Sequence, residues 1–195
     1  MNTTRIGSEY GGKHLDLSLL DKDSVVYSFG LGTDISFDLG LVERVGCNVF
    51  GFDPTPKAKL WLESQVLPEQ FRYLSLGLSD FDGDLHFSPP PFDHYVSYTP
   101  THNFSSSVVT LPVNRLVTVM KKLGHINLDL LKIDIESAEY SVIDDMIKTR
   151  ILPRQFLVEF HGNEILYGPY VKKLENEDYV VAAKELTDFT FIRGA

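Results

Sequence analysis

Short apolar runs alternate with helical patterns along this chain, and this alternation limits the fold more than any other feature. Apolar runs of strand length lie at residues 24–29, 48–53, 71–79, 128–136 and 155–162. Helical patterns lie at 34–46, 56–66, 116–124 and 137–149. Strands separated by helices pair in parallel through right-handed crossovers. The sequence therefore predicts an α/β fold with a doubly wound, Rossmann-like sheet and helices on both faces.

The end and the middle of the chain depart from this rhythm. After the fifth run the pattern predicts one more helix and then two strands, joined at Thr187-Asp188 by a turn so short that they must be antiparallel. Seven strands are thus expected, five parallel ones and a terminal hairpin. A single domain is expected over 24–195, with residues 1–23 as an extension packed on it. A lid-like insertion is expected at about 80–115, because residues 86–104 are rich in proline and aromatic side chains.

Charge and hydropathy exclude several classes of partner. The formal net charge is -9, and the longest basic cluster is the pair Lys121-Lys122, so a nucleic-acid partner is not expected. No stretch is long and apolar enough to cross a bilayer, so no membrane partner is expected either. The first residues lack the pattern of a secretory signal and Cys47 is the single cysteine, which predicts a cytoplasmic protein. The sequence gives no indication of the oligomeric state.

A glycine turn, "SFGLGTDIS", follows the first predicted strand. Ligands of open α/β sheets bind beyond the carboxyl ends of the strands, where Gly30 and Gly32 permit a tight turn and close backbone approach. Ile35 replaces the third glycine of the dinucleotide pattern, and Asp34 would repel a pyrophosphate. Both features disfavour a dinucleotide-dependent oxidoreductase. The ammonium group of S-adenosylmethionine, a cofactor without phosphate, would instead pair with Asp34.

The next two predicted strands also end in polar residues. Asp53 ends the second strand, a position from which an acidic side chain can accept hydrogen bonds from ribose hydroxyls. Ser79 and Asp80 end the third strand and are expected near an adenine. A purely structural role is the alternative, with the glycines forming a strand-to-helix turn, Asp34 capping the helix and Ser79-Asp80 forming a plain turn.

Charged residues recur with a period of two at the ends of the fourth and fifth predicted strands. Lys132, Asp134 and Glu136 share one face of the fourth strand, and Glu159 and His161 share one face of the fifth. Burying an unpaired carboxylate costs several kcal/mol, so these groups need partners or a ligand. His161 can act as a base oriented by Glu159 or Asp134, or the carboxylates and the imidazole can bind a divalent cation. The remaining alternative is a structural Lys132–Asp134 pair with a surface histidine.

These motifs together resemble the FkbM-type family of S-adenosylmethionine-dependent methyltransferases. The resemblance rests on "SFGLGTDIS", "GFDPTP", "LGLSDFDGDL", "LLKIDIESAEYSVI" and "LVEFH", and runs from about residue 24 to the carboxyl terminus. It implies the seven-stranded methyltransferase fold and methylation of hydroxyl groups of small molecules or sugars. It also implies that Gly30, Gly32, Asp34 and Asp53 contact the cofactor. The family usually has aspartate where Ser28 stands, and glycine where Ser137 stands.

The sequence thus predicts an S-adenosylmethionine-dependent O-methyltransferase that acts on a small hydroxylated acceptor. His161 is the expected base, with Glu159 and Asp134 beside it. Glu136 is expected at the acceptor, beneath the lid residues Tyr95 and Tyr98. No metal site is predicted, although a divalent cation is compatible with the cluster. The alternative is a degenerate fold that binds the cofactor or a partner without catalysis, which Ser28 keeps open.

Overall fold

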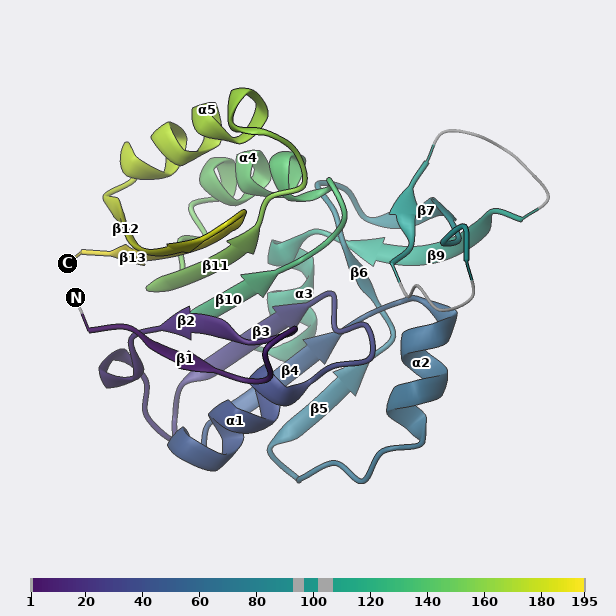
Figure 1. The fold of residues 1–195 in the computed structure, drawn as a ribbon, viewed down its shortest axis with the longest axis horizontal. Helices are drawn as coiled ribbons and strands as arrows, with labels where there is room; N and C mark the ends of the chain where they lie inside the picture. The colour runs from purple at the N-terminus through teal and green to yellow at the C-terminus, as the bar shows by residue number, and fades with distance from the viewer. Residues whose placement is uncertain (1, 93–96, 102–106, 195) are drawn as a thin grey trace.

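The computed structural model describes residues 2–92, 97–101 and 107–194, and its centre is a seven-stranded sheet (Figure 1). The strand order is β12 (Tyr179–Glu185), β13 (Asp188–Arg193), β11 (Gln155–Glu159), β10 (Leu130–Ile133), β3 (Val25–Phe29), β4 (Asn48–Phe52) and β5 (Phe71–Leu74). The strands from β11 to β5 are parallel, whereas β13 is antiparallel to both β11 and β12. The predicted Rossmann-like α/β class is confirmed.

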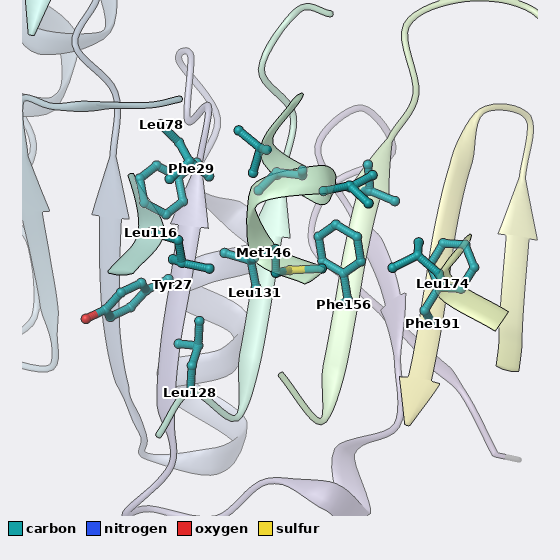
Figure 2. Close-up of a cluster of buried hydrophobic side chains, with 14 of the residues drawn as sticks. Tyr27, Phe29, Leu78, Leu116, Leu128, Leu131, Met146, Phe156, Leu174 and Phe191 are labelled. Atoms are coloured by element: carbon teal, nitrogen blue, oxygen red, sulfur yellow. The ribbon is translucent and has the colours of Figure 1, made fainter. Parts of the chain in front are cut away.

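Helices cover both faces of this sheet. The helices are α1 (Ser36–Val45), α2 (Pro56–Glu63), α3 (Leu116–Leu123), α4 (Glu139–Thr149) and α5 (Glu164–Glu175). Buried side chains of α3, α4 and α5 pack on one face, where Figure 2 shows Met146 beside the strand residues Leu131 and Phe156, and Leu174 beside Phe191. Side chains of α1 and α2 form a second core on the other face, with Leu130 of β10. Leu130 and Leu131 belong to different cores because successive side chains of a strand point to opposite faces.

No helix within the described residues is long and apolar enough to cross a membrane.

The first residues form a hairpin, β1 (Thr4–Ile6) with β2 (Lys13–Leu15), followed by a 3-10 turn, η1 (Leu17–Leu19). Ile6 and Leu15 are buried in the same core as α1 and α2. The fully buried side chain of Gln155, on β11, accepts the Asp16 N–H at 2.9 Å and donates to the Asp16 carbonyl at 3.0 Å. The amino-terminal segment is therefore tied to the middle of the main sheet.

A second, four-stranded sheet occupies the predicted insertion and lies at the right of Figure 1. Its order is β6 (Gly77–Leu78), β9 (Val109–Asn114), β7 (Gly83–Ser88) and β8 (Thr99–Pro100). The expectation of a single strand over 71–79 is wrong, because the Leu76 N–H bonds the Leu74 carbonyl at 2.9 Å and the chain turns out of the main sheet. The expected lid is thus partly an ordered sheet. Tyr95 lies outside the described residues.

We expect Gln155→Ala to lower the free energy of unfolding by about 2 to 3 kcal/mol, because the Asp16 amide and carbonyl lose their partners and a cavity forms. Gln65→Ala, which changes an exposed glutamine, should change the free energy by less than about 0.5 kcal/mol. Urea unfolding of both variants measures the difference. Equal stabilities would contradict the anchoring role of Gln155.

Candidate functional site

An open cavity lies at the carboxyl ends of β3, β4 and β10, and its empty volume, which includes open solvent, is about 800 Å³. Its lining comes from residues 30–33 after β3, 52–55 at the end of β4, 77–78 of β6 and 134–136 after β10. Phe87 and Tyr98 line it from the small sheet, and Tyr10 lines it from the amino-terminal segment. This is the edge at which open α/β sheets bind ligands.

The glycine turn brings the ends of β3 and β10 together. Gly30 has a φ of 77° and Gly32 a φ of 54°, in the left-handed region that favours glycine. A Cβ atom on Gly30 would lie 1.7 Å from the Asp134 carbonyl oxygen. The Gly30 carbonyl also accepts a hydrogen bond from Lys132 Nζ at 2.8 Å. No side chain fits at residue 30 unless the backbone moves.

Asp53 holds this turn from the neighbouring strand end. Its Oδ2 atom accepts the N–H groups of Leu31 at 3.0 Å and Gly32 at 2.9 Å. Its Oδ1 atom accepts the N–H and the hydroxyl of Thr55 at 2.9 and 2.6 Å, just before α2 begins. The carboxylate is buried from solvent yet lines the cavity. Any ribose hydroxyl would therefore share oxygen atoms that already organise the turn.

Asp34 lies behind the turn and is not among the residues that line the cavity. Its Oδ2 atom accepts the Ser8 hydroxyl at 2.5 Å, and its Oδ1 atom accepts the Ser36 N–H at 2.8 Å. Burial acts to raise the pKa of Asp34, but the hydrogen bonds from Ser36 and Ser8 outweigh it and lower the pKa. Asp34 thus joins the amino-terminal segment to the start of α1. Its contact with a cofactor stays a prediction.

At the end of the third predicted strand, the residues that line the cavity are those just before the predicted pair Ser79 and Asp80. Gly77 and Leu78 line the cavity, whereas Ser79 and Asp80 do not. Ser79 is buried and its N–H bonds the Asn114 carbonyl at 3.0 Å, while Asp80 is exposed. The two residues of β6 therefore line the cavity, and Ser79 and Asp80, which follow them, do not.

Ser28 lies beneath the turn, fully buried, and does not line the cavity. Asp38, on α1, and Lys132, on β10, are buried in the same region. Burial raises the pKa of Asp38 to about 6, an effect that the charge of Lys132 opposes. Having Ser28 in place of the family's usual aspartate therefore removes no group from the cavity wall. A carboxylate is still present below the turn, that of Asp38 on α1.

His161 is surrounded by three carboxylates just after β11. Its Nε2 atom lies 3.6 Å from Asp134 Oδ1 and 3.5 Å from Glu136 Oε2. Its Nδ1 atom lies 3.5 Å from Glu139 Oε1, the atom that also accepts the His161 backbone N–H at 2.7 Å. Burial alone would lower the pKa of His161, but Glu139, Glu136 and Asp134 together raise it to about 9. The imidazole is therefore protonated at neutral pH.

Asp134 and Glu159 are in different environments, although both were expected beside His161. Burial raises the pKa of Asp134 to about 6, with the charge of Lys132 opposing the shift. Glu159 instead accepts a hydrogen bond from Lys13 Nζ at 2.8 Å, and Lys13 also pairs with Asp188. Burial acts to raise the pKa of Glu159, but Lys13 outweighs it and the pKa is lowered.

The period of two that was predicted for the charged residues of β10 and β11 is wrong at the ends of these strands. β10 ends at Ile133 and β11 at Glu159, so the period of two does not reach Asp134, Glu136 or His161. Glu136 and Ser137 have φ angles of 53° and 80°, which turn the chain back before α4. Asp134, Glu136 and His161 still come together, but through loop geometry. Glu159 faces Lys13 and anchors the amino-terminal hairpin.

Three site residues were missed in the sequence. Glu139 has no exposed surface and shares the buried face of α4 with Val142, Ile143 and Met146, so an acidic residue on an apolar helical face was the available signal. Lys13 and Tyr10 belong to the amino-terminal segment and reach the site only through the fold. No local pattern in the sequence marks either of them.

The comparisons with known proteins agree on the general class. A family model described as a methyltransferase domain matches residues 5–190. The chain belongs to this methyltransferase family. S-adenosylmethionine, the cofactor expected from the sequence, is the cofactor of this family.

Relatives are found among curated proteins and among solved structures. The human probable methyltransferase-like protein 24 is 30% identical over 175 residues, which cover 82% of this chain and 42% of that protein. The rat protein of the same name is 29% identical over 174 residues, covering 81% of this chain and 42% of that protein. The chain therefore spans less than half the length of these curated relatives.

Solved structures include the fibrillarin of Aeropyrum pernix with natively bound S-adenosyl-L-methionine, at 13% identity and a TM-score of 0.49, over 91% of this chain and 68% of that one. An rRNA methylase from Streptococcus thermophilus matches at 12% identity and a TM-score of 0.47, over 89% of this chain and 87% of that one. Structural matches with TM-scores below 0.5 carry no argument about the methyl acceptor.

We expect Asp53→Ala to weaken S-adenosylhomocysteine binding at least tenfold, because the turn loses the acceptor of two amide groups. Glu69→Ala, which removes an exposed carboxylate outside the cavity lining, should leave the affinity unchanged. Isothermal titration measures both, with circular dichroism as the check of folding. Wild-type affinity in Asp53→Ala would contradict the role of Asp53.

Replacing Ser137 by glycine should stabilise the protein by up to about 1 kcal/mol, because a residue with a Cβ atom is strained at a φ of 80°. Ser137→Ala keeps the Cβ atom and should give no such gain. Thermal unfolding of the two variants separates relief of strain from loss of the hydroxyl. A gain of the same size in both variants would rule out backbone strain as the cause.

Proposed function

We propose that this domain transfers a methyl group from S-adenosylmethionine to a hydroxyl group of a small molecule or sugar, as in the FkbM-type enzymes that the sequence resembles. The observation that carries the proposal is the cluster of Asp134, Glu136 and His161, because two of its members line the same cavity as the glycine turn. Ionisable groups beside the methyl donor are what an acceptor hydroxyl needs in order to lose its proton.

The cavity offers a place for each part of the cofactor. Gly30 and Gly32 expose backbone beside the position proposed for the methionine moiety. Asp53 would accept hydrogen bonds from the ribose. Pro54 and Leu85, which are half-buried, provide apolar surface for the adenine. In this arrangement the sulfonium methyl group would face Asp134 and Glu136.

Methyl transfer is an in-line displacement, so positioning supplies much of the acceleration. An alcohol must also lose its proton as its oxygen attacks. His161 can take that proton only when its imidazole is neutral, and the raised pKa keeps it protonated at neutral pH. Asp134, with a pKa of about 6, is ionised at neutral pH. It is therefore better suited than His161 to accept the proton.

The proposed acceptor is neutral or cationic. The formal net charge of -9 and the carboxylates at the cavity disfavour a polyanion. Phe87 and Tyr98 provide apolar surface at the cavity from the small sheet. Ser28, which favoured a non-catalytic domain, lies outside the cavity lining, so the main argument for that alternative is weakened.

The proposal is tested by incubating the purified chain with methyl-labelled S-adenosylmethionine and a panel of hydroxylated small molecules and sugars, with RNA as a separate arm. We expect labelled methyl ethers, and a fall in kcat of about a hundredfold in Asp134→Asn. Asp144→Asn, which changes an exposed carboxylate paired with Lys173, should keep the wild-type rate. Label in RNA alone would contradict the proposed acceptor class. Cofactor binding without transfer to any acceptor would favour the non-catalytic alternative.

A further inference from the structure

Asp134, Glu136 and His161 each offer one ligand atom, and the three atoms lie within 4.8 Å of one another. His161 Nε2 is 3.6 Å from Asp134 Oδ1 and 3.5 Å from Glu136 Oε2. Neighbouring ligands of a divalent cation bound at about 2.1 to 2.4 Å lie about 3.0 to 3.4 Å apart. Small side-chain movements therefore suffice to place all three atoms around one ion.

Glu139 provides a second, independent observation. Its side chain has no exposed surface, its Oε1 atom faces His161 Nδ1 at 3.5 Å, and its Oε2 atom has no hydrogen-bond partner among the described residues. A histidine that ligates a metal commonly presents its other ring nitrogen to a carboxylate, which fixes the ring orientation and makes the ligating nitrogen more basic. Here Glu139 faces His161 Nδ1, whereas Asp134 and Glu136 face His161 Nε2. The four residues therefore have this arrangement.

We propose that Asp134, Glu136 and His161 form a divalent-cation site at the edge of the cofactor cavity, with Glu139 as the positioning residue behind His161. Two carboxylates and one imidazole suit a first-row transition ion such as Mn²⁺ or Zn²⁺, since an imidazole ligand is less suited to Mg²⁺ or Ca²⁺. Three protein ligands leave coordination positions open, as in catalytic rather than structural metal sites.

The place of the site gives the ion a role that rests on the proposed function. Asp134 and Glu136 line the cavity that also contains the glycine turn, so an open position of the ion would face the acceptor hydroxyl. A bound cation lowers the pKa of a hydroxyl that it coordinates. With Asp134 occupied as a ligand, the O–H bond breaks and its proton passes to solvent instead of to Asp134, and the oxygen forms a bond to the methyl carbon. The carbon–sulfur bond breaks with its electron pair on sulfur, which leaves as neutral S-adenosylhomocysteine.

Isothermal titration of the full chain with MnCl₂, ZnCl₂ and, for comparison, MgCl₂ tests the site without any methyl acceptor. We expect one Mn²⁺ or Zn²⁺ ion per chain, bound more tightly than Mg²⁺. Glu136→Gln should raise the dissociation constant at least tenfold, and Glu139→Gln by about ten- to a hundredfold although it is not a ligand. Glu69→Gln, which changes an exposed carboxylate outside the cavity lining, should bind the ion as the wild type does.

The absence of binding of Mn²⁺ and Zn²⁺ at millimolar ion would overturn the proposed site, as would equal affinities in the wild type, Glu136→Gln and Glu139→Gln. Circular dichroism of each variant separates loss of the site from loss of the fold. Methyl transfer at the full rate in the presence of a chelator would overturn the catalytic role of the ion and leave the proposed methyltransferase function intact. Weaker metal binding by Glu136→Gln and Glu139→Gln than by the wild type supports the site even where no acceptor is methylated.

Discussion

The close approach of Gly30 to Asp134 is the constraint on which the rest of the site depends. The absence of a side chain at residue 30 lets the turn after β3 lie against the chain that leaves β10. This contact brings the glycine turn of the cavity wall next to the acidic cluster. Lys132 reinforces it by donating to the Gly30 carbonyl, and Asp53 holds the following amides from β4. Three neighbouring strand ends thus form one rigid wall.

Electrostatic balance explains how so many acidic groups can share this edge of the sheet. Lys13 pairs with Glu159 and Asp188, and the charge of Lys132 acts on Asp134 and Asp38 from below the turn. The amino-terminal hairpin therefore supplies a cation to the main sheet and is not simply an appendage. Asp134, Glu136 and Glu139 are left with His161 as their shared positive partner. A cluster with this surplus of carboxylate is suited to a divalent cation that replaces the proton on His161 Nε2.

Much of the fold and part of the site could be predicted from the sequence. The alternation of strands and helices is a local pattern, and the glycine turn and Asp53 lie at strand ends that this pattern locates. The ends of β10 and β11 were placed too late, because an apolar run does not reveal where hydrogen bonding to the neighbouring strands stops. Glu159 was expected beside His161, whose charge does act on it, but its hydrogen bond to Lys13, which is distant in the sequence, could not be predicted.

Contacts that join distant segments account for the remaining differences. Asp34 was expected at the cofactor, a contact that stays a prediction; its carboxylate also binds Ser8, which belongs to the amino-terminal segment. The run at 71–79 divides between two sheets because Gly77 pairs with Val113. Ser137 was noted where glycine is usual, and its left-handed backbone supplies the physical reason for that preference. Only Glu139 carried an unused local signal, a charge on the apolar face of α4.

The central claim is that the strand ends of β3, β4 and β10 form one cofactor site beside the acidic cluster. A crystal structure of the chain with S-adenosylhomocysteine tests it most directly. The account predicts the ligand in the cavity, with its ribose at Asp53, its sulfur facing Asp134 and Glu136, and its adenine against Pro54 and Leu85. A ligand bound elsewhere, or with its sulfur turned away from the acidic cluster, would contradict the account.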